Sequence, residues 1–155
     1  MTLNQPRDFG KAVGVGAIVA VLTGAVTAPL FQSGLAPMPQ APSQAFAETL
    51  LGPVPEPVGF LFHVLYVTAV TTLILAFTGP RASKRAIAGS SAALWAIAIV
   101  VFFPLVGWGL FGAAVTPKIA VAALVPHVLY GVLLWAVSRL VFRASGSTDR
   151  AFRRA

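Results

Sequence analysis

The chain has 155 residues, of which 57% are hydrophobic and only 10% are charged, and its formal net charge is +7. A soluble domain carries about 25% charged residues, so this composition excludes an ordinary soluble protein. The apolar runs lack the strict alternation of a membrane β-barrel, and the chain has no cysteine for a disulfide, a thiolate metal site or covalent haem attachment.

Four apolar runs of about 20 residues or longer dominate the sequence. They cover residues 12–31, 58–78, 87–111 and 119–142. At a rise of 1.5 Å per residue, each run as a helix crosses a hydrocarbon core of about 30 Å. We therefore predict an all-α fold, a four-helix transmembrane bundle in a single membrane domain of residues 1–155. Arg7 and Lys11 precede the first run as in a signal peptide, but no well-placed cleavage site follows, so we expect this helix to be retained.

The outer loop of residues 32–57 is rich in proline and contains a short predicted helix. Ser43 is placed to cap the start of this helix and Gly52 to end it. The helix is expected to lie at the outer membrane interface or to fold over the bundle, because three apolar residues share one of its faces: Phe46, Leu50 and Leu51.

Lys and Arg are unevenly distributed along the chain. They precede the first run, occupy the loop between the second and third runs and follow the fourth, whereas residues 32–57 contain none and the third loop has only Lys118. By the positive-inside rule, the N-terminus, the second loop and a tail of residues 143–155 are cytoplasmic, and the other two loops face outward. We interpret the positive charge as a topology signal rather than as a sign of nucleic-acid binding, with contact to anionic headgroups as the alternative.

Two short words recur in the same order along the chain. The pattern P-L-x-x-x-G-L starts at Pro29 and at Pro104, near the ends of the first and third runs, and H-V-L-Y occupies residues 63–66 and 127–130. This self-similarity predicts two tandem helix hairpins. Because each hairpin contains two spans, both start on the same side of the membrane, and the predicted internal repeat is parallel.

The H-V-L-Y words contain all the histidines and tyrosines of the chain. Within each word, His and Tyr are three residues apart and project from one helical face. Both helices run inward from the outer surface, so His63 and His127 are expected at similar depth, as a pair near the outer side. One hypothesis is a b-type haem with these imidazoles as axial ligands and with Tyr66 and Tyr130 as hydrogen-bonding groups behind them. Room for the macrocycle would come from two small residues one turn away, Gly59 and Gly131.

Two other interpretations of the His pair stay open. Each His is a satisfied core group, bonded to the Tyr of the opposite hairpin, to Thr68 or Thr71, or to backbone beside Pro126. Alternatively, the pair forms a metal, quinone or proton site with the tyrosines as partners. Zinc normally takes at least three protein ligands, so we predict no metal site and leave the cofactor unknown apart from haem b.

Catalytic groups are not visible in the sequence. The four acidic residues lie outside the apolar runs, so no carboxylate is available there for a proton relay or a cation path: Asp8, Glu48, Glu56 and Asp149. We predict a small polytopic membrane protein that is not an enzyme on its own, most simply a non-catalytic accessory or structural subunit. The alternatives are a bis-His haem b electron-transfer subunit and a small transporter. Expected partners are the lipid bilayer and other membrane subunits or further copies, with a stripe of small residues as the candidate contact face if another helix of the chain does not fill it: Gly14, Ala17, Gly24 and Ala28.

Three segments carry a resemblance to known proteins: PSQAFAETLLG in the first loop, FPLVGWGLFG at the end of the third run and PHVLYGVLLW in the fourth. With them, the chain resembles an uncharacterised group of small four-span prokaryotic membrane proteins. The resemblance implies a compact bundle in a bacterial or archaeal inner membrane, with the histidines turned toward its outer mouth, and it implies no activity. Val67 follows Tyr66 where Gly131 follows Tyr130, which departs from exact twofold symmetry.

Overall fold

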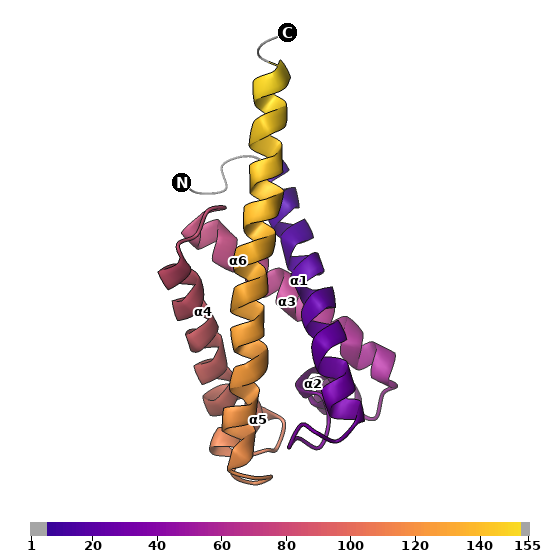
Figure 1. Cartoon of the computed structure of the whole chain (residues 1–155). Helices are drawn as coiled ribbons and strands as arrows, with labels where there is room; N and C mark the ends of the chain where they lie inside the picture. The colour runs from indigo at the N-terminus through magenta and orange to yellow at the C-terminus, as the bar shows by residue number, and fades with distance from the viewer. Residues whose placement is uncertain (1–5, 153–155) are drawn as a thin grey trace.

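A computed structural model describes residues 6–152 of the chain, including the side chains of residues 8–143. This part of the chain is helical and contains no strand, as predicted (Figure 1). In chain order the elements are α1 (Pro6–Gln32), α2 (Pro42–Leu51), α3 (Glu56–Thr78), α4 (Lys84–Ile97), the π-helical segment η1 (Ala98–Phe102), α5 (Phe103–Leu105), the 3₁₀ turn η2 (Leu110–Gly112) and α6 (Lys118–Phe152).

Four stretches are long and apolar enough to cross a membrane: Asp8–Gln32, Glu56–Thr78, Lys84–Leu105 and Lys118–Arg143. The prediction of an all-helical chain with four long apolar helices is therefore confirmed. The third span, however, ends at Leu105 and not at residue 111. Gly107 and Gly109 have φ angles of 80° and 75°, in the left-handed region that glycine adopts without steric cost, and this conformation ends the helix.

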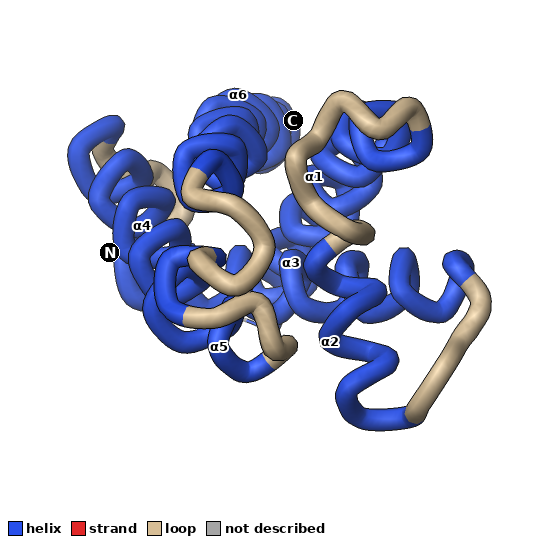
Figure 2. The backbone as a smooth tube through the Cα atoms, turned by 90° about the horizontal axis from the view of Figure 1, so that it is seen from below, coloured by secondary structure: helices blue, strands red, loops and turns tan. Residues whose placement is uncertain are grey.

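The four long helices form a row rather than a closed ring. α1 packs extensively against α3, and it also packs against α6, which in turn packs against α4. Viewed along the helices, α4, α6 and α1 follow one another, and α3 lies beside α1 (Figure 2). α3 and α4 are therefore the two edges of the row.

The helices alternate in direction, so that α3 and α6 run the same way (Figure 1). One end of the molecule, here called the basic end, gathers the start of α1, the α3–α4 connection and the upper part of α6. It carries the described cations Lys11, Arg81, Lys84, Arg85, Arg139 and Arg143. The opposite end, here called the loop end, contains α2, α5 and η2. This segregation of charge matches the loop grouping expected from the sequence.

The contact between α1 and α3 depends on Gly16. A Cβ atom at this position would lie 2.8 Å from both the Cα and the carbonyl oxygen of Thr68, closer than real side chains approach. The missing side chain lets the two backbones come together, as small residues do between membrane helices. Apolar side chains of α1, α3 and α6 surround this region in one buried cluster, which includes Val15, Val19, Val67, Leu75 and Leu134.

A second buried cluster lies at the loop end. It joins η1, α5 and the start of α6 through Ile99, Phe103 and Ile119. Trp108 also belongs to it, with its ring 5.2 Å from that of Phe103. The turn after the third span is therefore a packed part of the fold rather than a free loop.

The predicted short helix of the first loop is present as α2. Gly52 ends it, as expected, but the prediction that Ser43 caps its start is wrong. The N-cap residue is Ala41, and Pro42 occupies the first helical position, where its fixed φ favours helix and its missing N–H costs nothing. Phe46 packs between Phe62 and Phe102, at ring distances of 6.0 and 5.5 Å.

Glutamine side chains fix α2 and the proline-rich loop. Gln40 and Gln44 each donate a hydrogen bond to the carboxylate of Glu48, at 3.0 and 2.8 Å. These bonds, the one from Gln40 first, hold the pKa of Glu48 below its usual value, since they stabilise the charged form. Gln44 also donates to the Val54 carbonyl oxygen at 2.7 Å. α2 is thus tied to both sides of its own loop, whereas its place at a membrane interface stays a prediction.

The tandem repeat also stays a prediction. In its favour, α1 packs against α3 and α4 packs against α6, so each proposed hairpin forms an internal contact. Gly34 and Gly109, which match within P-L-x-x-x-G-L, both have left-handed φ angles, of 71° and 75°. The two H-V-L-Y words, in contrast, lie in different surroundings, as the next subsection describes.

Candidate functional site

His63 links α3 to α1. Its Nε2 lies 3.0 Å from the Ala20 carbonyl oxygen and 3.1 Å from Thr23 Oγ1. A carbonyl oxygen can only accept, so the geometry favours the tautomer with hydrogen on Nε2. The Thr23 hydroxyl in turn donates to the Val19 carbonyl oxygen at 2.8 Å, which leaves its lone pairs for the imidazole. The stacked ring of Phe60 covers the same histidine, with centroids 6.1 Å apart.

His127 bonds within its own helix. Its Nδ1 lies 2.7 Å from the Ala123 carbonyl oxygen, one turn earlier on α6. The hydrogen is therefore on Nδ1, and Nε2 keeps its lone pair. Among the described contacts, none joins His127 to His63. The two histidines thus have opposite tautomers and different structural partners.

The two tyrosines also differ. Tyr66 is 54% exposed, whereas Tyr130 is 6% exposed and its hydroxyl lies 3.1 Å from Thr71 Oγ1 of α3. Tyr130 therefore ties α6 to α3 at the centre of the molecule. Tyr66 is more exposed, but it still interacts electrostatically with Tyr130. Each H-V-L-Y word bonds to a neighbouring helix, but through a different member of the word.

The space expected for a haem is filled by protein. A Cβ atom at Gly59 would collide with Gln44 of α2, and one at Gly131 would lie 2.6 Å from the Ser91 hydroxyl of α4. The small residues beside the histidines therefore admit neighbouring side chains rather than a macrocycle. In addition, Nε2 of His63 already donates to the Ala20 carbonyl oxygen and would have to lose this bond to ligate iron. Haem binding stays a hypothesis without a contact to support it.

Several Ser and Thr hydroxyl groups are buried in the apolar spans, and the sequence did not indicate which of them would be buried. The buried Ser and Thr residues come from all four spans: Thr23, Thr27, Thr71, Thr72, Ser91 and Ser138. Most of these hydroxyls donate to a carbonyl of the preceding turn, as Thr27 does to Thr23 and Thr72 to Thr68, both at 2.8 Å. In the sequence, each of these residues is visible only as a Ser or Thr within an apolar run. That position does not indicate which neighbouring helix the hydroxyl faces.

Three polar contacts connect neighbouring long helices. Beyond His63 and the Tyr130–Thr71 pair, Trp95 Nε1 of α4 donates to the Ala120 carbonyl oxygen of α6 at 2.9 Å. His63 thus joins α3 to α1, Tyr130 joins α6 to α3 and Trp95 joins α4 to α6, whereas among the described residues no such side-chain bond joins the packed pair α1 and α6. Of the residues involved, His63, Tyr130 and Thr71 were named from the sequence, although Thr71 was expected to bond a histidine and bonds Tyr130 instead.

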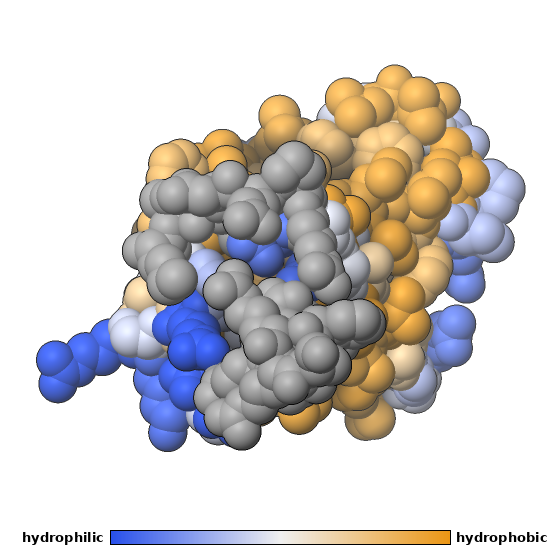
Figure 3. All heavy atoms as spheres, turned by 90° about the horizontal axis from the view of Figure 1, so that it is seen from above, coloured by the Kyte–Doolittle hydropathy of each residue, from blue (hydrophilic) through white to orange (hydrophobic). Residues whose placement is uncertain are grey.

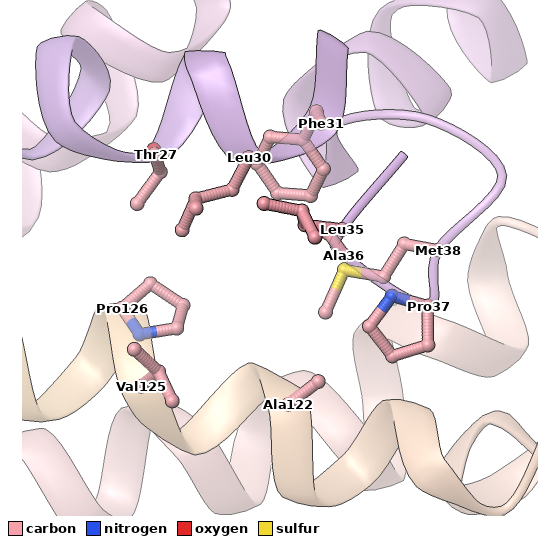
Figure 4. Close-up of a pocket in the computed structure, with 10 residues that line it drawn as sticks. All are labelled: Thr27, Leu30, Phe31, Leu35, Ala36, Pro37, Met38, Ala122, Val125 and Pro126. Atoms are coloured by element: carbon pink, nitrogen blue, oxygen red, sulfur yellow. The ribbon is translucent and has the colours of Figure 1, made fainter. Parts of the chain in front are cut away.

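A cavity of about 150 Å³ lies at the loop end between α1 and α6. Its lining is almost wholly apolar, and Figure 4 shows Thr27 and Leu30 of α1 facing Val125 and Pro126 of α6, with Met38 on one side. The Thr27 hydroxyl already donates to the Thr23 carbonyl. This cavity offers a hydrocarbon surface and no free ionisable group, so it does not provide a polar path. Neither histidine lines it.

The described residues contain no group of three or more His, Cys, Asp or Glu side chains that could hold a metal ion. The arrangement is that of a helical membrane protein whose central polar groups are used for contacts between and within helices. Comparison of the chain with protein-family models, with curated proteins and with solved structures finds no match. The resemblance to small four-span prokaryotic proteins therefore stays a prediction.

Proposed function

We propose that the chain is a non-catalytic accessory or structural subunit of a membrane complex. The bonding of its interior supports this. The His63 imidazole and the Tyr130 hydroxyl hold helices together, and His127 bonds its own helix. Groups held in structural bonds are less available to bind a substrate or to carry protons, although each histidine keeps one ring nitrogen outside the bonds described, Nδ1 of His63 and Nε2 of His127.

The observation that carries the proposal is the outward face of α4. This edge helix packs against α6 on one side, and small residues are exposed on its opposite side: Ala88, Gly89, Ala92, Ala93 and Ala96. A Cβ atom added to Gly89 would meet nothing within 4 Å. Such a face, with small residues four apart, lets a further helix approach closely.

The other edge of the row serves as a comparison. The exposed side chains of α3 are large, with Leu65, Leu73 and Phe77 exposed by 60, 56 and 80%. Bulky apolar side chains fill the space beside flexible lipid tails, but they keep a neighbouring backbone at a distance. The third span also exposes Ile97, Val100 and Val101, so the difference in chemistry is confined to the small-residue face between Ala88 and Ala96, which is the part suited to a protein partner.

The contact face expected on α1 depended on its not being filled by another helix of the chain. Gly24 of that stripe is covered by Phe60 and His63 of α3, whereas Gly14 is open. The stripe is thus divided between an internal contact and the exterior. It serves the packing of α1 against α3 more than association, and α4 replaces it as the proposed contact face.

Crosslinking tests the proposal directly, because the chain has no cysteine of its own. A thiol-anchored photocrosslinker on the variant Ala92→Cys, in native membranes, is expected to give protein adducts. The matched variant Leu73→Cys on α3 is expected to react with lipid alone. Adduct masses would distinguish a second copy of the chain from a different subunit.

A second test fills the small-residue face of α4 with a bulky side chain. Ala92→Leu is expected to release the chain from its complex on a native gel in mild detergent, whereas Leu73→Ala leaves the complex intact. A chain that migrates as a monomer without any substitution, and gives no protein adduct from position 92, would rule out the subunit role.

A further inference from the structure

The basic end contains a cavity of about 180 Å³ lined by Arg81, Arg139, Phe142 and Arg143. Arg81 lies in the connection between α3 and α4, and the other three residues share one face of α6. Three guanidinium side chains from two elements therefore line one small space. Figure 3 shows this end of the molecule, where hydrophilic residues lie at the helix ends and hydrophobic residues cover the flank.

The positive charges of this cavity have no described counter-charge. Within residues 8–143 the one ion pair joins Lys11 to Asp8 at 3.5 Å, and no carboxylate lies within ion-pairing distance of the three arginines. The Nε of Arg139 is buried and has no hydrogen-bond partner. A buried donor on a charged group is costly to leave unpaired, and an anion in the cavity would remove this cost.

Aromatic rings hold the surrounding cations without neutralising them. The guanidinium of Arg139 lies 5.7 Å from the Trp135 ring, and the ammonium of Lys84 lies 5.1 Å from the same ring. On the other side, the Lys11 ammonium lies 5.8 Å from the ring of Phe142, which lines the cavity. Cation–π contacts of this kind position the charges in advance. Among the lining arginines, Arg139 is thus held by an aromatic ring, and the cavity as a whole has an excess of positive charge.

The depth of the cavity indicates the ligand. The second span ends at Thr78 and the third begins at Lys84, so Arg81 in the connection between them places the cavity where hydrocarbon gives way to headgroups. Planar guanidinium groups match the oxygens of a phosphate in bidentate geometry. We propose that this cavity binds a phosphate group, supplied by the headgroup of an anionic phospholipid or by free phosphate.

Native mass spectrometry of the protein, released from detergent and titrated with phosphatidylglycerol or phosphatidylcholine, tests the proposal. The unsubstituted chain is expected to prefer phosphatidylglycerol. Arg143→Gln removes one exposed guanidinium from the cavity and is expected to weaken this binding about fivefold. Arg85→Gln removes the same charge from the same end, but Arg85 does not line the cavity, so binding is expected to stay unchanged.

Inorganic phosphate distinguishes the two sources. Free phosphate is a ligand if it binds the protein in phosphatidylcholine nanodiscs and also, in a separate titration, displaces bound phosphatidylglycerol. Phosphate without effect, beside retained phosphatidylglycerol, would identify the lipid headgroup. The proposal is overturned if neither ligand binds, or if Arg85→Gln weakens binding as much as Arg143→Gln, because a diffuse surface charge would then account for the result.

Discussion

At the scale of single residues, the same tetrapeptide performs two different tasks. In α3 the word H-V-L-Y contributes its histidine to a neighbouring helix, and in α6 it contributes its tyrosine. The reason is geometric, since the direction in which a side chain points depends on which neighbour its helix face meets. Identity of sequence therefore did not bring identity of role.

This difference predicts unequal effects of substitution at the two histidines. His63→Phe keeps an aromatic ring but removes a bond between helices, and we expect it to lower the free energy of unfolding by about 1 kcal/mol. His127→Phe removes a bond within one helix and should change this free energy much less. Unfolding in mixed micelles with rising SDS measures both values. Equal losses would contradict the role assigned to His63.

The same two variants test the haem hypothesis. Protein purified from haem-replete cells is compared in reduced and oxidised form by absorbance. A b-type α band that disappears in both His63→Phe and His127→Phe would establish axial ligation. It would also require a rearrangement of the bonds to Ala20 and Ala123. A colourless, folded protein would remove haem from consideration.

At the scale of elements, the contact of α1 with α3 predicts a contrast between two nearby glycines. Gly16→Ala places a methyl group against the backbone of Thr68, and we expect a loss of about 1–3 kcal/mol of unfolding free energy, as overpacking usually costs. Gly14→Ala meets nothing within 4 Å and is the matched control, expected to be neutral or slightly stabilising because alanine favours helix. SDS titration also measures this pair.

If both variants behave alike, the close approach of the two helices at Gly16 is not what limits stability. The hydrophobic pattern alone could not have told these positions apart. Both are glycines in the first apolar run, and only the neighbouring helix distinguishes them.

Hydropathy predicted the spans well, because length and apolarity are local properties of the chain. The end of the third span was missed, since the left-handed conformations of Gly107 and Gly109 are not visible in a hydropathy profile. The filling of the space beside Gly59 and Gly131 was missed for a different reason. Gln44 and Ser91 approach these glycines from other elements, so the site depends on tertiary packing that periodicity does not encode.

At the scale of the whole molecule, the segregation of charge gives a prediction of orientation. Ala114→Cys at the loop end is expected to react with an impermeant thiol reagent added outside intact cells, and Ser83→Cys at the basic end is expected to react only after permeabilisation. Both positions are exposed, unlike Ala82, which is 3% exposed and would be silent in either orientation. The reverse labelling pattern would invert the topology.

The row arrangement also sets what the chain can and cannot do alone. α4 packs against α6, whereas α3 packs against α1 and α2, and the exposed faces of these two helices are unlike. An assembly through one edge would leave the other facing lipid. A single copy thus has two different lateral faces, one suited to a protein partner and one to lipid.

The π-helical segment Ala98–Phe102 has a consequence for how related sequences can vary. Its bonding skips to the fifth residue, as from the Phe103 N–H to the Ala98 carbonyl, and so accommodates one residue more than a regular helix needs. The helical turn beyond it, α5, is rotated by about 100° relative to a regular helix, and its Phe103 packs in one buried cluster with Trp108 and Ile119. A relative that lacks one of these five residues would show the same hydropathy profile and the same basic end. Its loop end, however, would present another face of the helix, so a single deletion here could remodel one end of the molecule and leave the other unchanged.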